Sequence, residues 1–207
     1  MKRLCYILFC FNVFGLFAQN QINDENIKTL IEKYSPNLDL KCNIIVKIEV
    51  EGMNIPNKQV YVEFRKNKKT IVKGKGLALL PKKGFVNQFN ELFSTPLHAI
   101  FLSRKKNNLI YKLVSLDQKS DWITADIIFD EQSFLIYEAT LNTRKNGTFH
   151  IIHSYSNNIY PSKSIITFSI KEFKIPLKFI GRKQNVINQQ KTDKDVKGKV
   201  TLLYTYL

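Results

Sequence analysis

The sequence predicts a mostly β fold of the α+β class, a curved antiparallel sheet or incomplete barrel with a short helical lid or plug. Two observations predict it. From residue 41 onward, segment after segment places apolar residues at every second position, which is the period of a half-buried strand. Short turns rich in Asn, Gly and Asp separate these segments, as they do between consecutive antiparallel strands.

The first residues have the order of a secretory signal peptide. Lys2 and Arg3 precede an apolar run that ends at the small residue Ala18. The run is shorter than the roughly 20 apolar residues that a membrane-spanning helix needs. We therefore expect cleavage after Ala18, so that residues 1–18 are a signal peptide and residues 19–207 form one domain outside the cytoplasm.

The chain is strongly basic, with 32 Lys and Arg against 17 Asp and Glu and a net charge of +15. This charge predicts a negatively charged partner. Nucleic acid is not expected, because the lysines are spread over turns and strand edges and no recognition motif is present. An anionic membrane surface is the partner that we expect, and the alternative is that the lysines serve solubility and protect strand edges. Cys42, the one cysteine of residues 19–207, is expected to be a small, partly buried hydrophobe.

One amphipathic helix is predicted before the first strand. Asp24 is placed to cap it, and apolar residues then recur at spacings of three and four until Ser-Pro-Asn at 35–37 ends it. The apolar residues are Ile27, Leu30, Ile31 and Tyr34. Such a helix needs an apolar surface to cover.

An antiparallel hairpin follows the helix. Residues 44–50 alternate, residues 52–57 form a turn, and residues 60–65 alternate again. A short strand is predicted at 70–72. The segment 82–97 is too aromatic for a solvated loop and too irregular for a strand, so we expect one or two short helices packed over the sheet.

Six further strands are predicted in the second half of the chain. They cover residues 109–116, 122–129, 134–142, 148–155, 163–173 and 199–206. Turns at 130–133 and 144–147 set the register of the middle strands, and Asn146-Gly147 is the strongest hairpin signal in the chain. The polar residues 185–197 are predicted to connect the last two strands.

Four short motifs follow the predicted helix, the hairpin and the insert that begins with Leu80-Pro81. They are Phe-Asp-Glu-Gln-Ser-Phe-Leu-Ile at 129–136, Lys-Asn-Gly at 145–147, Tyr-Pro-Ser-Lys at 160–163 and Lys-Gly-Lys-Val at 197–200. This order resembles the LolA-type outer-membrane lipoprotein carriers, including LolB-like proteins, over nearly all of residues 19–207. The resemblance implies a monomeric, non-enzymatic periplasmic carrier or chaperone in lipoprotein transport. It also implies a concave apolar face that binds acyl chains, a helical lid, and membrane-bound donor and acceptor proteins.

The apolar residues of the strands and of the 82–97 insert are the candidates for such a site. A groove for acyl chains needs apolar side chains and no special polar group, because burial of a methylene is non-directional and contributes about 0.8 kcal/mol. The candidate lining residues are Val46, Ile48, Val60, Val62, Phe64, Trp122, Phe134, Ile136, Ile166 and Phe168. The candidate lid residues are Phe85, Phe89, Leu92 and Phe93. The alternative is that all of them form the ordinary core of a β domain.

No catalytic residue, cofactor or metal site is predicted. Of the three histidines, His150 and His153 fall in one predicted strand at an odd spacing, which places them on opposite faces. The sequence has no zinc-binding Cys/His pattern, no glycine-rich phosphate loop and no nucleophile elbow. The acidic residues that we expect in turns or in solvent are Asp126, Asp130 and Glu131.

The leading hypothesis is a periplasmic carrier that binds acyl chains of lipoproteins or lipids and shuttles them toward the outer membrane. The alternative is a non-catalytic binding or sensor module of the cell envelope with the same fold, which recognises a protein through its basic convex surface. A hydrolase that uses His153 is a third, more distant hypothesis.

Overall fold

The computed structural model describes residues 24–34, 39–50, 53–65, 68–74, 92–156, 160–170 and 196–207. Within them the chain forms a ten-residue helix, a helical turn at 92–94 and eleven strands. The elements are α1 (Glu25–Tyr34), β1 (Leu40–Val50), β2 (Met53–Asn54), β3 (Lys58–Arg65), β4 (Lys68–Lys73), β5 (Leu97–Lys105), β6 (Asn108–Ser115), β7 (Trp122–Asp130), β8 (Ile136–Thr143), β9 (Thr148–Ser154), β10 (Lys163–Ile170) and β11 (Val196–Tyr206). No helix in these ranges has the length and hydrophobicity of a membrane-spanning segment.

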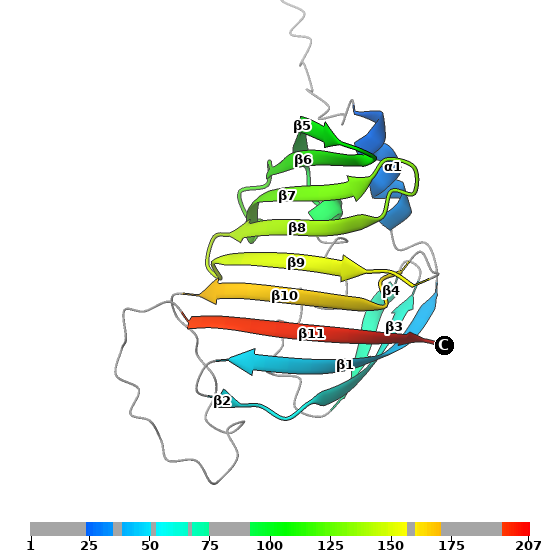
Figure 1. Cartoon of the computed structure of the whole chain (residues 1–207), viewed down its shortest axis with the longest axis vertical. Helices are drawn as coiled ribbons and strands as arrows, with labels where there is room; N and C mark the ends of the chain where they lie inside the picture. The colour runs from blue at the N-terminus through cyan, green and yellow to red at the C-terminus, as the bar shows by residue number, and fades with distance from the viewer. Residues whose placement is uncertain are drawn as a thin grey trace, which may run out of the picture.

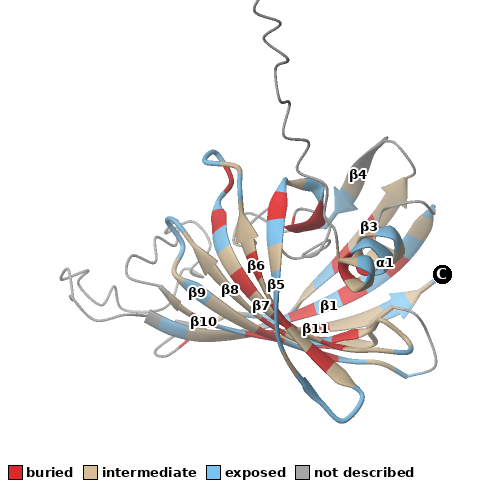
Figure 2. Cartoon of the chain, turned by 90° about the horizontal axis from the view of Figure 1, so that it is seen from above, coloured by how far each residue is buried: buried red, intermediate tan, exposed pale blue. Residues whose placement is uncertain are grey.

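All eleven strands belong to one antiparallel sheet (Figure 1). Its order is β4-β3-β1-β11-β10-β9-β8-β7-β6-β5, with β2 beside β1. The C-terminal strand β11 therefore joins the N-terminal hairpin to the later strands. The predicted curved antiparallel sheet is confirmed (Figure 2). The sheet is open, because no described strand pairs with the outer edge of β4 or of β5. The described strands therefore do not form a closed β-barrel.

The alternation that predicts β1 is visible in its burial. Cys42, Ile44, Val46 and Val50 are buried, and the residues between the first three are exposed. We call the buried side of the sheet the inner face and the opposite side the outer face. Cys42, predicted to be partly buried, is only 1 % exposed, and desolvation raises the pKa of its thiol to about 11.

Helix α1 has the predicted cap and lies on the inner side of the sheet (Figure 2). The Asp24 carboxylate accepts hydrogen bonds from the backbone N–H groups of Asn26 and Ile27 at 3.0 and 3.1 Å. Its second oxygen accepts a hydrogen bond of 2.9 Å from the hydroxyl of Tyr111 in β6. At the other end of α1, the Tyr34 hydroxyl accepts a 3.0 Å bond from the backbone N–H of Ile136. These bonds hold α1 against β6 and the start of β8.

Replacement of Asp24 with alanine should lower the free energy of unfolding by about 1–2 kcal/mol. The variant loses the helix cap and leaves the buried Tyr111 hydroxyl without its carboxylate acceptor. Urea denaturation of the chain lacking residues 1–18 measures the change. Glu32→Ala, on the exposed side of the same helix, is the matched control and should change the free energy of unfolding by less than about 0.5 kcal/mol. Equal effects of the two variants would contradict the predicted anchoring of α1.

The turn between β7 and β8 differs from its prediction by two residues. Phe134, predicted to lie in a strand, lies in this turn with a φ of 53°, and β8 begins at Ile136. Asp130 organises the turn, since its carboxylate accepts bonds from the backbone N–H and the hydroxyl of Ser133, both at 2.7 Å. The same bonds, with that of the backbone N–H the larger cause, lower the pKa of Asp130. The Phe134 ring stacks on Phe129, which holds the left-handed residue in place.

The second predicted turn is confirmed. Strands β8 and β9 pair as a hairpin from Asn142 and Thr148 onward, and Gly147 adopts a φ of 77° in the loop. A positive φ is a conformation that glycine adopts without steric cost.

The alternation does not predict two strands, the two-residue β2 inside the predicted turn at 52–57 and the longer β5. Strand β5 is the larger difference. It lies at the edge of the sheet and pairs only with β6 among the described strands. Its central residues Ile100, Phe101 and Leu102 are all 40–51 % exposed, so it has no alternation of buried and exposed residues. The predicted lid residues Leu92 and Phe93 are buried in the helical turn before β5. Phe85 and Phe89, the predicted signal peptide and residues 185–195 lie outside the described residues.

Candidate functional site

The ten candidate lining residues all lie in the hydrophobic core or against it. Seven are buried: Val46, Val60, Val62, Trp122, Ile136, Ile166 and Phe168. Three are partly buried and pack against the core: Ile48, Phe64 and Phe134. Most of the predicted lining is therefore in contact with the protein's own side chains, including those of α1.

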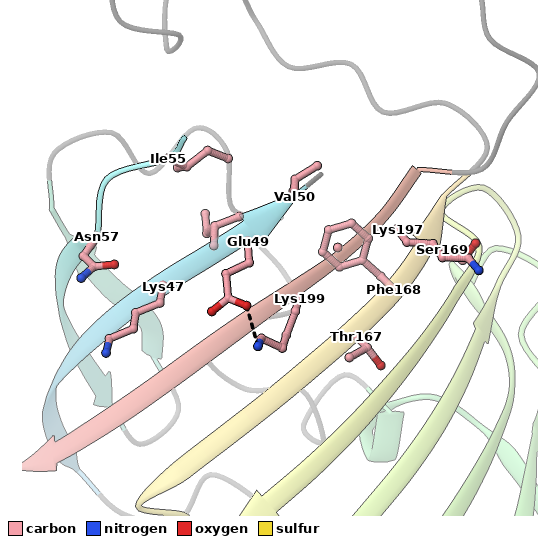
Figure 3. Close-up of a pocket in the computed structure, with 12 residues that line it drawn as sticks. Lys47, Glu49, Val50, Ile55, Asn57, Thr167, Phe168, Ser169, Lys197 and Lys199 are labelled. Atoms are coloured by element: carbon pink, nitrogen blue, oxygen red, sulfur yellow. Dashed lines mark ion pairs between the residues drawn. The ribbon is translucent and has the colours of Figure 1, made fainter. Parts of the chain in front are cut away.

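An open hollow of about 910 Å³ lies at the end of the sheet where β1 and β10 finish and β11 begins (Figure 3). Two candidate lining residues, Ile48 and Phe168, contribute to its wall. Its apolar wall consists of Ile48, Val50, Ile55, Phe168 and the backbone of Gly198. Its polar wall consists of Lys47, Glu49, Asn57, Thr167, Ser169, Lys197 and Lys199. The hollow thus joins inner-face apolar side chains to outer-face polar ones at one end of the sheet.

Ile48 marks the place where burial of the inner face decreases next to the hollow. It lies in register with Val200 of β11, and the row continues through Ile166 and Ile151. Those three residues are 2–4 % exposed, whereas Ile48 at the end of the row is only partly buried. Ile48 is therefore an apolar inner-face residue of β1 that the core covers only in part and that lines the hollow.

The Phe168 ring lies directly over β11 (Figure 3), at a position that only glycine permits. A Cβ atom added to Gly198 would stand 2.2 Å from Cζ of the ring, well inside van der Waals contact. Any side chain at residue 198 would therefore move the ring. Phe168 also contacts Phe149 of β9, with ring centroids 6.3 Å apart, and is 8 % exposed. Gly198 and Phe168 together shape one wall of the hollow.

The rim of the hollow is positively charged. It carries Lys47, Lys197 and Lys199 against the single carboxylate of Glu49, which forms an ion pair with Lys199 at 2.5 Å. The excess of ammonium groups favours an anionic group at the mouth, although exposed charges are screened by salt.

A polar cluster lies inside the core, on the inner face of β9, β10 and β11. The Nδ1 atom of His153 is 2.7 Å from the Ser164 hydroxyl, which in turn donates to the Tyr204 hydroxyl at 3.2 Å. His153 is 5 % exposed and Ser164 is fully buried, so the pair is part of the core. Desolvation lowers the pKa of His153 to about 4, which keeps the imidazole neutral at physiological pH.

The predicted opposite placement of the two strand histidines is confirmed. His153 lies on the inner face, and His150 lies on the outer face with its Nε2 atom 3.8 Å from the Glu138 carboxylate. The acidic residues also lie where they were expected, since Asp126 pairs with Lys112 on the outer face and Glu131 pairs with Arg104.

The sequence pattern did not identify Ile55, Gly198 and the three rim lysines as site residues. Ile55 lies between β2 and β3, where no alternation exists to mark it. In the sequence, Lys197-Gly198-Lys199 was identified only as part of the Lys-Gly-Lys-Val motif at 197–200. Its relation to Phe168 depends on the pairing of β10 with β11, where Phe168 is in register with Gly198.

The solved structures that are similar to this chain include the following three. A LolA superfamily protein from Nitrosomonas europaea has a TM-score of 0.52 at 11 % identity, over 86 % of this chain and 90 % of that chain. A putative outer-membrane lipoprotein-sorting protein domain from Vibrio parahaemolyticus has a TM-score of 0.44 at 9 % identity, over 87 % and 89 %. A DUF1329 family protein from Desulfovibrio piger has a TM-score of 0.48 at 6 % identity, over 87 % and 88 %. No family model and no curated protein sequence matches the chain. The first similarity shows that the fold is LolA-like.

Proposed function

We propose that this protein is a carrier of the cell envelope that holds the acyl chains of a lipoprotein or lipid in the hollow at the ends of β1, β10 and β11, and passes them toward the outer membrane. The observation that carries this proposal is the open hollow of about 910 Å³ beside Ile48, Val50 and Phe168, next to an inner face whose described apolar residues are mostly buried. The LolA-like fold supports it, because a solved structure that shares the fold is that of a LolA superfamily protein.

The dimensions and the chemistry of the hollow suit an amphiphile. Its volume of about 910 Å³ falls within the roughly 300–1,000 Å³ that is usual for ligand pockets. Each methylene transferred from water to its apolar wall would contribute about 0.8 kcal/mol. The lysines of the rim would then face the polar end of the guest. This function needs no catalytic group.

Binding of a fluorescent fatty acid tests the proposal directly. The purified chain lacking residues 1–18 is titrated with a dansyl-labelled long-chain fatty acid below its micelle concentration. We expect a saturable rise in fluorescence at a single site, reversed by unlabelled fatty acid. Fluorescence that does not saturate, or that resists competition, would contradict the proposal. Native mass spectrometry of the protein taken from its own envelope then identifies the cargo.

Export to the periplasm is the second part of the proposal. The protein recovered from the envelope should begin at Gln19, as measured by intact mass. Leu8→Arg interrupts the apolar run and should leave the full-length chain in the cytoplasm, because a charged residue opposes insertion of the signal peptide. Recovery of the wild-type chain with residues 1–18 still attached would contradict the predicted cleavage.

A further inference from the structure

The outer face of β1, β10 and β11 carries a concentration of lysines, which we call the basic face. Alternate residues of the three strands point to this side of the sheet. Its lysines are Lys41, Lys47, Lys163, Lys197 and Lys199. Glu49 is the one acidic residue at the outer positions of these strands.

The positive charge of the basic face is not neutralised within the described structure. Glu49 pairs with Lys199, and none of the described ion pairs includes Lys47, Lys163 or Lys197. In strands β5 to β9, three basic residues have acidic partners. These pairs are Lys112 with Asp126, Arg104 with Glu131 and His150 with Glu138. The outer positions of β1, β10 and β11 thus combine five lysines with the single carboxylate of Glu49.

Apolar side chains lie among these lysines. Ile45 is in register with Leu203 of β11, and Leu203 is in register with Lys163 of β10. On the neighbouring row, Ile165 is in register with Ile152 of β9. Ile45 and Ile152 are 37 % and 42 % exposed. Ile45 lies next to Lys47 on β1, and Ile152 lies at the border of the basic face, between Ile165 and Glu138 of β8. These exposed isoleucines make the surface amphipathic.

We propose that the basic face docks onto the surface of an anionic lipid bilayer. Lysines near such a surface are attracted to lipid phosphates, and exposed apolar side chains can enter the headgroup region between them. Lys47, Lys197 and Lys199 also line the hollow, so docking would bring its mouth to the bilayer. The proposal goes beyond the carrier function and does not require the hollow to hold an acyl chain.

Sedimentation with large unilamellar vesicles tests the docking. The chain lacking residues 1–18 is mixed with vesicles of phosphatidylcholine alone, or of phosphatidylcholine and phosphatidylglycerol in a two-to-one ratio. We expect binding to the anionic vesicles only, weakened by added salt. The variant with Lys47→Gln, Lys163→Gln and Lys197→Gln should bind about 100-fold more weakly, since each lysine near an anionic surface contributes about fivefold.

The matched control changes three exposed lysines elsewhere, Lys105→Gln, Lys106→Gln and Lys119→Gln, and so has the same net charge. It should bind the anionic vesicles within about threefold of the wild type, because these lysines are far from the basic face in the sheet order. A second variant with Ile45→Ser and Ile152→Ser should weaken binding at every salt concentration without changing its salt dependence. Equal loss in the basic-face variant and the lysine control, or equal wild-type binding to neutral and anionic vesicles, would overturn the proposal. Uptake of the fluorescent fatty acid in vesicle-free solution reports separately on the carrier function.

Discussion

Replacement of Ile48 with tryptophan should weaken the binding of the fluorescent fatty acid by about 15-fold. Ile48 is the partly buried member of its cross-strand row and forms part of the apolar wall of the hollow. The larger indole would occupy space that the guest chain needs. Displacing only two methylenes of the guest would cost about 1.6 kcal/mol, which corresponds to this factor. The hollow has room for the indole, so the free energy of unfolding should change by less than about 1.5 kcal/mol.

The control for this substitution lies on the same strand. Ile45→Trp introduces the same side chain on the outer face, where Ile45 is 37 % exposed. It should leave the dissociation constant of the fatty acid in vesicle-free solution unchanged within about twofold. Fatty-acid titrations and urea denaturation are measured for both variants. If Ile48→Trp binds the fatty acid as tightly as Ile45→Trp does, the guest does not occupy this hollow.

Acidification should destabilise the protein through His153. The pKa of this histidine falls from 6.5 to about 4 in the folded chain because burial disfavours the charged imidazole. Between these two values the unfolded chain binds a proton that the folded chain does not, so stability decreases as the pH falls from 6.5 to about 4. The lowered pKa corresponds to a loss of roughly 3 kcal/mol over this window.

Two variants on β9 isolate this contribution. His153→Gln removes the titrating group but can still hydrogen bond to Ser164, so its unfolding free energy should vary about 3 kcal/mol less than that of the wild type over the same pH window. His150→Gln, on the outer face, should retain the pH dependence of the wild type. Urea denaturation at a series of pH values provides the comparison, and carboxylates such as Asp130 contribute equally to all three chains. Parallel curves for the wild type and His153→Gln would contradict a neutral, buried His153.

Local patterns predicted most elements of the fold because each of them depends on neighbouring residues. The cap at Asp24 and the three- and four-residue spacing after it produced α1, and the alternation from Cys42 to Val50 produced β1. Strand β5 was not predicted from such a pattern. Ile100, Phe101 and Leu102 form an apolar run without alternation, and an edge strand does not need one exposed and one buried side.

The candidate site could be predicted only in part. Ile48 and Phe168 were predicted to lie on the inner face, and both line the hollow. Val62 and Ile136 were predicted in the same way but are completely buried. Alternation identifies the face of a strand on which a side chain lies and does not identify what covers that face. Here the cover over Ile136 includes Tyr34 of α1, about 100 residues earlier in the chain.

The sequence by itself determined the class of fold, the capped helix, nearly all the strands and the side of the sheet that each strand residue takes. These properties follow from hydrogen bonding and side-chain direction over a few residues. The tertiary structure decided that the sheet stays open, that α1 covers one part of its inner face, and that space remains beside Ile48 and Phe168. Those outcomes depend on contacts between distant segments, such as Gly198 beneath the Phe168 ring, which no local period encodes.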